Sequence, residues 1–565
     1  MNSRRFVLFA VLFLLLGVFL ARLPSTLAAV GLGARPDPMA AIGDVYELVR
    51  GRFVDEPDPA ALQRGAIRGM LEALNDPYTV YVPPADQAEF EKAITGRYVG
   101  IGAEVISRDG WLTIVTPLED SPALAAGLLP GDRVVEIEGA VTRGLTIDAC
   151  IERIVGEPGT PVRLTIERDG ARLAFTITRA EIVTRAVKGF AHPAGSDQWS
   201  YMIDPERRVA YLRLTQFTPT SPREFDAALR SLDADRAPPG AMILDLRGNP
   251  GGLLDTAVEI ADRFLPSGEI VSTKGRSFRK STLRAKGPGT LPDFPLIVLL
   301  DGRSASASEV LAGALADNGR AIVIGSRSFG KGSVQAIETL PHDAGAQVKI
   351  TEQHWYTPGG KLIHRTDAAT AWGVDPTPGF FVPQSPAQQT EQFLARRRFD
   401  TIDPRGADRA GAAAPALPRW SDPDWIASEL RDEPLAQALR VARARLETGA
   451  WAALPGQPSE PVAAAASVNA DEHRRLFRTR ERLAIELDRM DRRLDALENS
   501  GGAPAAKPRL WGEHVDVRGG RLEVFDKDGN RVASLRIDDP ELDRWLEPAD
   551  LKVDAGVPAT EGKGP

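Results

Sequence analysis

The sequence predicts a multidomain α/β protein. We expect an N-terminal helical segment, a module of short strands, an α/β core with a mixed sheet, and a C-terminal extension with one helix and one hairpin. The chain has 565 residues, which at roughly 150 residues per domain is too long for one core. Strands alternate with helices in its middle. With 43% hydrophobic and 26% charged residues, it is neither wholly disordered, collagen-like, nor a polytopic membrane protein.

Charge and cysteine content exclude several function classes. The net charge of -8 is not that of a general nucleic-acid binder. The single cysteine, Cys150, allows no intrachain disulfide and no thiolate-based zinc or iron-sulfur site; we expect it to be inert packing. The six histidines show no HExxH or comparable spacing. We therefore expect no metal and no cofactor.

Residues 1–34 read as a leader. Arg4 and Arg5 precede an uncharged apolar run from Phe6 to Ala21, and small residues follow at 25–29. This order is typical of an export signal. The run is longer than most signal-peptide cores but shorter than the about 20 residues of a membrane span. The sequence predicts a periplasmic protein and leaves open whether the leader is cleaved or tethers the chain to the inner membrane.

The next two regions differ in periodicity. In residues 35–95, apolar side chains from Asp44 to Leu74 recur at helical spacing and are interrupted by a Pro57–Pro59 turn, which predicts two helices. In residues 96–183, short strands surround turns such as Asp109-Gly110 and Asp169-Gly170, with one helix near 147–155. This second region is predicted to be a separate strand-rich domain.

Residues 184–395 form the predicted α/β core. Strands such as "RVAYLRL", "AMILDLR" and "LIVLLDG" alternate with helical stretches, as in a partly parallel sheet. Residues 396–565 contain linkers rich in Ala, Arg and Pro, a helix from Asp471 to about Glu498, and a hairpin that turns at Asp528-Gly529. The helix carries a short a/d seam, which predicts either local packing or self-association.

Two loops of the core could carry chemistry. Asp245–Gly252 ("DLRGNPGG") follows a strand, and its glycines would let backbone N–H groups approach an anion. A plain strand-to-helix connection is the alternative. Ser304, Ser306 and Ser308 open a helix, where the dipole favours an alkoxide-like nucleophile. Serines are also preferred N-caps, so any one of them could be structural.

A third segment places Lys331 between two glycines after a strand. Gly325 and Gly330-Lys331 have the spacing of a phosphate-binding loop, but Gly332 stands where Ser or Thr should bind Mg²⁺. The following "SVQAIETL" also reads as a strand and not a helix. An ATPase is therefore disfavoured, and a solvated loop lysine is the remaining alternative.

In this order, the "DLRGNPGG", "SASASE" and "FGKGSVQ" segments resemble those of the C-terminal processing peptidases, or tail-specific proteases. These are serine proteases with a Ser/Lys dyad and an embedded PDZ domain. The resemblance runs from about residue 44 to 382 and includes "GAIRGMLEALNDPYTVYVPP" and "HWYTPGGKLIHR". The sequence departs from the family at Asn75, in "LNDPYT", and at His364-Arg365.

The resemblance assigns roles by position. It implies Ser306 as the nucleophile, Lys331 as the general base and Gln335 as the residue that orients the lysine. It implies an oxyanion hole made by the amide of Ala307 and one amide from Gly251 or Gly252. The chemistry agrees, because no histidine lies in a comparable Gly/Ser-rich setting, and a lysine can act as base when burial lowers its pKa to about 7–8.

Residues 96–183 resemble a PDZ domain. The Gly100-Ile101-Gly102-Ala103 loop resembles one that binds a terminal carboxylate, with Arg97 as a nearby cation. Ile147, Ile151 and Ile154 would line the peptide groove from the helix. Packing in the hydrophobic core is the alternative for each isoleucine.

Together these features predict an exported serine endopeptidase that recognises protein C-termini and processes or degrades envelope proteins. The expected partners are proteins or peptides with free C-termini, and no nucleic acid; a homo-oligomer and an adaptor or activator protein are left open. The first alternative is a proteolytically inactive scaffold that binds C-termini through the PDZ domain. The second is an assembly protein in which the C-terminal extension has the main role.

Overall fold

The structure is a computed structural model of the 565-residue chain. It divides into two units, residues 1–462 and 463–565. The described residues are 38–192, 198–232, 238–343, 345–366, 369–402, 419–456, 521–525 and 531–536. The predicted leader, the predicted helix at 471–498 and the hairpin turn at Asp528-Gly529 lie outside them.

The N-terminal region contains the two predicted helices on either side of the proline turn. These are α2 (Pro38–Arg52) and α3 (Pro59–Glu72). Asp58 caps α3 by accepting a hydrogen bond from the amide of Ala60 at 2.9 Å. Strand β1 (Val80–Val82), a 3₁₀ turn (Pro84–Asp86) and helix α4 (Gln87–Thr95) follow. Strand β1 leads the chain to the edge of the protease region.

The strand-rich module forms one antiparallel sheet in the order β3-β4-β5-β7-β8, with β6 paired to β5. Its core is made of aliphatic side chains from these strands, with Cys150 and Ile154 of α6. The bounds are β3 (Ala103–Arg108), β4 (Trp111–Pro117), α5 (Pro122–Ala125), β5 (Arg133–Ile137), β6 (Ala140–Val141), α6 (Ile147–Ile154), β7 (Pro161–Arg168) and β8 (Ala171–Thr178). Strands β2 (Arg97–Gly100) and β9 (Ala180–Val183) pair where the chain enters and leaves the module.

The core sheet of the α/β region is mixed, as the sequence predicts. Strands β12, β13, β16 and β17 are parallel, while β10 and β11 run antiparallel to β12. The bounds are β10 (Val187–Lys188), β11 (Met202–Asp204), β12 (Val209–Leu214), β13 (Ala241–Asp245), β16 (Leu296–Leu300) and β17 (Ile322–Gly325). All residues of β13 and β16 are buried, as expected of a sheet covered on both faces.

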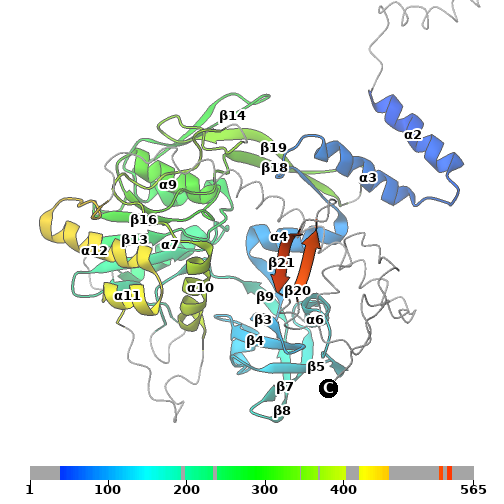
Figure 1. The fold of residues 1–565 in the computed structure, drawn as a ribbon, viewed down its shortest axis with the longest axis horizontal. Helices are drawn as coiled ribbons and strands as arrows, with labels where there is room; N and C mark the ends of the chain where they lie inside the picture. The colour runs from blue at the N-terminus through cyan, green and yellow to red at the C-terminus, as the bar shows by residue number, and fades with distance from the viewer. Residues whose placement is uncertain are drawn as a thin grey trace, which may run out of the picture. The chain divides into compact units, whose positions relative to one another are not determined.

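Helices cover both faces of this sheet (Figure 1). One face packs against α7 (Ser221–Leu232), α8 (Leu254–Asp262) and α9 (Ala307–Asp317). The other packs against α11 (Pro423–Glu429) and α12 (Glu433–Thr448), which bury Trp425, Leu435 and Leu439. Alternate residues of the strands face the two layers, so Leu244 packs on one side and Ile243 on the other. Helices α11 and α12 therefore belong to the protease core, although they lie beyond residue 395.

A second sheet is antiparallel, in the order β1-β19-β14-β15, with β18 paired to β19. Its bounds are β14 (Glu269–Gly275), β15 (Ser281–Arg284), β18 (Ser333–Thr339) and β19 (Gln347–Tyr356). Helix α10 (Pro386–Asp400) follows, and the second unit contains the paired strands β20 (Arg521–Phe525) and β21 (Arg531–Arg536). Among the helices of the described ranges, none is long and apolar enough to cross a membrane.

Candidate active site

Ser306 occupies a strained turn between β16 and α9. Its backbone has φ 57° and ψ -116°, and a positive φ is unfavourable for a residue with a Cβ atom. Ser306 is the N-cap of α9 and lies at the positive end of the helix dipole. Such strain, at the start of a buried helix, is typical of a residue whose side chain must face a ligand.

The three serines of this segment have different surroundings. The hydroxyl of Ser304 donates to the carbonyl of Leu246 at 2.9 Å, and that of Ser308 donates to the carbonyl of Asn249 at 3.0 Å. Both serines are fully buried, whereas Ser306 is half-buried. Ser304 and Ser308 thus tie the helix start to the glycine-rich loop, and Ser306 is the serine that solvent can reach.

The glycine-rich loop packs directly against Ser306. A Cβ atom on Gly251 would lie 2.7 Å from the Cβ of Ser306, so this position requires glycine. The amide of Gly251 already donates to the Oδ1 of Asn249 at 2.8 Å. Within the described ranges, the amides of Gly252 and Ala307 donate to no acceptor. Of the two glycines that the sequence left open, Gly252 is therefore better suited to bind an oxyanion with Ala307.

Buried ion pairs fix the base of this loop. Asp245 ends β13 and accepts hydrogen bonds from the hydroxyl of Tyr211 at 2.8 Å and the guanidinium of Arg247 at 2.6 Å. Burial opposes the charge on Asp245, but Arg247 outweighs it and lowers the pKa of the carboxyl. Arg247 also donates to Asp432, the N-cap of α12, at 2.7 Å. Helix α12 thus supports the loop from the opposite side of the sheet.

The carboxylate of Glu309 joins the serine segment to the lysine loop. Its Oε2 accepts from the amides of Ser306 at 2.7 Å and Lys331 at 2.8 Å. Its Oε1 accepts from the amide of Gly330 at 2.6 Å and the hydroxyl of Ser328 at 2.5 Å. Glu309 is fully buried, and burial raises its pKa to about 7 against these four donors. The side chain of Glu309 therefore links the backbones of the two candidate catalytic residues, Ser306 and Lys331.

Lys331 lies in the loop between β17 and β18, where its charge is disfavoured. Burial, reinforced by the positive charge of Lys349, lowers the pKa of Lys331 to about 8. Its amine lies 4.9 Å from the ring centroid of Tyr78, and its carbonyl accepts from the indole of Trp355 at 3.1 Å. The described residues include no hydrogen bond between the amine of Lys331 and the hydroxyl of Ser306. The Ser306 and Lys331 loops are thus joined through Glu309, while the amine of Lys331 lies against Tyr78.

Among the described residues, Gln335 forms no hydrogen bond with Lys331. Its side-chain amide donates to the hydroxyls of Ser333 at 2.8 Å and Thr351 at 3.2 Å, both on the second sheet. Gln335 lies on β18, four residues after the lysine, as the sequence predicts. Its role in orienting Lys331 stays a prediction.

The expected carboxylate-binding loop of the strand-rich module contains backbone amides that could bind a ligand. The carbonyls of Ile101 and Gly102 accept from the module's own backbone, while in the described ranges their amides have no acceptor. Gly102 has φ 74°, and a Cβ there would lie 2.4 Å from the Cβ of Ser121. The loop leads from Gly100 into Ala103, the first residue of edge strand β3. An extended peptide could therefore pair with β3.

The other predicted peptide-binding residues flank this loop. Arg97 is exposed and pairs with Glu181 across β2 and β9 at 3.2 Å. Ile147 and Ile151 lie on α6 and are half-buried, and Ile147 also packs against the module core. The core alternative thus holds for Ile154, which is buried in the module core, and in part for Ile147.

Two residues of the site had no assigned role in the sequence interpretation. Glu309 is the last residue of the "SASASE" segment. Ser306 and Glu309 have the S-x-x-E spacing of a capping box, which is the sequence signal that could have identified Glu309. Tyr78 was visible only in "LNDPYT". No sequence pattern pairs it with Lys331, since the contact depends on the fold. In the parts that the structure describes, no group of His, Cys, Asp or Glu side chains could hold a metal ion.

Comparisons with known proteins identify the family of this chain. The family model for "Peptidase family S41" matches residues 208–377, that for "PDZ domain" matches 113–168, and that for "Activating protease CtpB N-terminal domain" matches 28–85. The Carboxy-terminal-processing protease of Bartonella bacilliformis is 37% identical over 353 residues, which are 61% of this chain and 75% of the relative. This chain belongs to the carboxy-terminal processing proteases of family S41.

Further relatives carry the same family name. The Carboxy-terminal processing protease CtpB of Bacillus subtilis is 36% identical over 350 residues, which are 61% of this chain and 68% of that protein. The solved structure of a photosystem II D1 C-terminal processing protease is 26% identical, with a TM-score of 0.36, over 62% of this chain and 87% of that one.

As a carboxy-terminal processing protease, the chain is a serine-type endopeptidase with a PDZ domain. The predicted family, fold class and enzyme class are confirmed, and the inactive scaffold is disfavoured. The domain bounds and the roles of individual residues stay predictions.

Proposed function

We propose that this protein is an exported endopeptidase that captures protein C-termini with its PDZ domain and cleaves peptide bonds with a dyad of Ser306 and Lys331. The observation that carries the proposal is the carboxylate of Glu309, which accepts from the amides of both dyad residues. Strain at Ser306 and burial of Lys331 support it independently.

In the proposed reaction, the neutral amine of Lys331 takes the hydroxyl proton of Ser306 as the oxygen attacks the scissile carbonyl. For this step the amine must leave the ring of Tyr78 and come within about 3 Å of the hydroxyl. The tetrahedral oxyanion would be held by the amides of Ala307 and Gly252. Lys331 then gives the proton to the leaving amine, and water hydrolyses the acyl-enzyme by the same route in reverse.

The PDZ domain would select the substrate. The amides of Ile101 and Gly102, which have no acceptor among the described residues, offer two donors to a terminal carboxylate. Edge strand β3 offers backbone groups to the peptide residues before that carboxylate. Arg97 would add positive charge, while Ile147 and Ile151 would contact the apolar side chains of the peptide. Its substrates would be envelope proteins with accessible C-termini, and a homo-oligomer and an adaptor or activator stay predictions.

The leader predicts that this reaction takes place outside the cytoplasm. A fusion of residues 1–34 to alkaline phosphatase, which becomes active only where its disulfides form, is expected to be active. The matched control replaces apolar residues of the run 6–21 by aspartate and should be inactive. An inactive wild-type fusion would contradict export.

The dyad predicts a specific pH dependence. Because the base must be neutral, turnover should rise with pH, by about tenfold per pH unit well below the pKa, and level off above the lysine's pKa of about 8. Lys331→Arg keeps the charge but cannot give up its proton, so kcat/KM should fall by roughly 10²–10⁴-fold. The measurement is the pH profile of kcat/KM, with Ser306→Ala as the inactive reference.

Lys349→Arg is the matched control, since Lys349 is a neighbouring half-buried lysine with no part in the proposed proton transfer. It should keep a rising profile. If Lys331→Arg retained substantial turnover, another group would have to deprotonate Ser306.

The PDZ assignment predicts selective capture of free carboxylates. Peptides with an apolar C-terminal residue should bind the Ser306→Ala protein at least about tenfold more tightly than their C-terminal amides, because charge-assisted hydrogen bonds to the loop are lost on amidation. Fluorescence anisotropy of labelled peptides measures this. Equal affinity for acid and amide would refute tail recognition.

A further inference from the structure

Residues 76–82 connect the N-terminal helices to the protease site. Strand β1 pairs with β19, with Val80 opposite Lys349. The hydroxyl of Thr79 donates to the Oδ2 of Asp76 at 2.7 Å and accepts from the amide of Thr351 at 3.0 Å. This segment is thus fixed to the sheet that also contains β18, the strand that follows Lys331.

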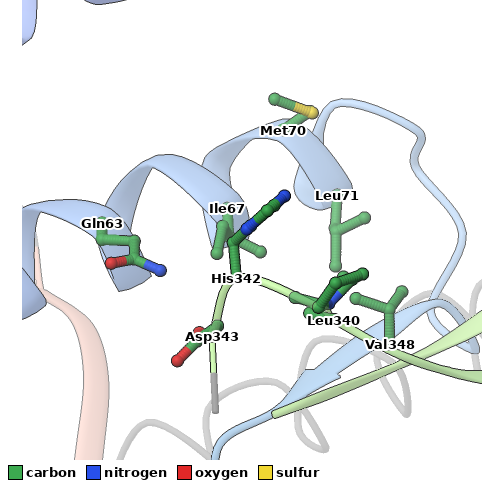
Figure 2. Close-up of a pocket in the computed structure, with 9 residues that line it drawn as sticks. Gln63, Ile67, Met70, Leu71, Leu340, His342, Asp343 and Val348 are labelled. Carbon is green, nitrogen blue, oxygen red and sulfur yellow. The ribbon is translucent and has the colours of Figure 1, made fainter.

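Helix α3 extends the attachment. Figure 2 shows Ile67 and Leu71 of α3 facing the connection between β18 and β19 across a pocket lined by Leu340 and Val348. Asp343, which also lines the pocket, accepts a hydrogen bond from the hydroxyl of Tyr81 at 2.5 Å. The conformation of Tyr78, between α3 and β1, is therefore set by contacts on both sides.

Tyr78 presents its ring to the proposed general base. The amine of Lys331 lies 4.9 Å from the ring centroid, within the about 6 Å range of a cation–π interaction. Four other charged or titratable groups surround the lysine: Lys349 on β19, Asp76, Glu309 on α9, and His364. Of these, none is hydrogen-bonded to the amine among the residues that the structure describes. The ring of Tyr78 is thus a direct contact of the amine.

We propose that Tyr78 is a positioning residue for the general base: its ring binds the ammonium form of Lys331 and keeps the amine away from Ser306 until the lysine loses its proton. A neutral amine is not attracted to the ring and is free to reach the serine hydroxyl. The ring therefore sets the pH at which the base becomes available. This inference rests on the proposed role of Lys331.

Two substitutions of Tyr78 separate the effect of the aromatic ring from that of burial. Tyr78→Leu keeps an apolar side chain that shields the lysine but removes the quadrupole, so the ammonium loses stabilisation. The titration midpoint of Lys331 should fall by about 0.5 to 1 pH unit. Tyr78→Phe keeps the ring and is the matched control, in which the midpoint should stay as in the wild type.

The midpoint can be measured without catalysis. The full chain with Ser306→Ala is labelled with ¹³C at the lysine Cε, the Lys331 signal is identified by its loss in Lys331→Arg, and its chemical shift is followed with pH. In the active enzyme, the acid limb of kcat/KM should move by the same amount and in the same direction. Cooperative thermal unfolding of each variant checks that it is folded.

A midpoint that is unchanged or higher in Tyr78→Leu would overturn the proposal, as would an equal shift in Tyr78→Phe. If Tyr78→Leu does not fold, Tyr78→Trp gives the same test with opposite sign, because indole binds cations more strongly and should raise the midpoint. The titration does not depend on turnover. The two proposals can therefore fail separately. If the midpoint shifts as predicted but the Lys331→Arg enzyme remains active, the dyad is refuted and the contact between Tyr78 and Lys331 is still established.

Discussion

The candidate active site depends on one buried carboxylate. Glu309 lies in the first turn of α9. Its carboxylate accepts hydrogen bonds from the start of that helix and from the loop that carries Lys331. A fully buried charge is costly unless every lone pair is occupied, and here four donors converge on it. The same atoms that make the charge tolerable fix the backbone of Ser306 in its strained conformation. The backbone strain at Ser306 and the burial of Glu309 are thus linked by the same hydrogen bonds.

The rest of the fold holds this arrangement in place. Asn249 and Asp301 join the glycine-rich loop to the serine segment through backbone amides, and Arg247 anchors the loop to Asp432 on the opposite face of the sheet. The lysine loop is held by the second sheet, whose strand β19 also pairs with β1. Segments far apart in the sequence therefore meet at the candidate site.

Local patterns predicted the elements, and the resemblance to a known family assigned the candidate dyad. Alternation of buried strands with amphipathic helices was sufficient for the mixed sheet, and the glycines and serines marked the loops at its edge. Tertiary contacts decided the rest. The residue pattern by itself left all three serines open, and the structure distinguishes Ser304 and Ser308 from Ser306 by their hydrogen bonds to Leu246 and Asn249. The Ala-rich composition beyond residue 395 concealed Leu435 and Leu439, whose burial makes α12 part of the core. Tyr78 meets Lys331 through strand pairing that no local pattern contains.

The most direct test of this account is the rate at which a serine-directed phosphonate labels Ser306 in Glu309→Gln. A glutamine amide cannot accept hydrogen bonds with its nitrogen, so some of the four donors lose their partner; labelling should slow by about 10²-fold and the free energy of unfolding should fall by about 1–3 kcal/mol. Glu338→Gln, on the exposed part of β18, is the matched control and should be labelled at the wild-type rate. Wild-type labelling and stability in Glu309→Gln would contradict the account.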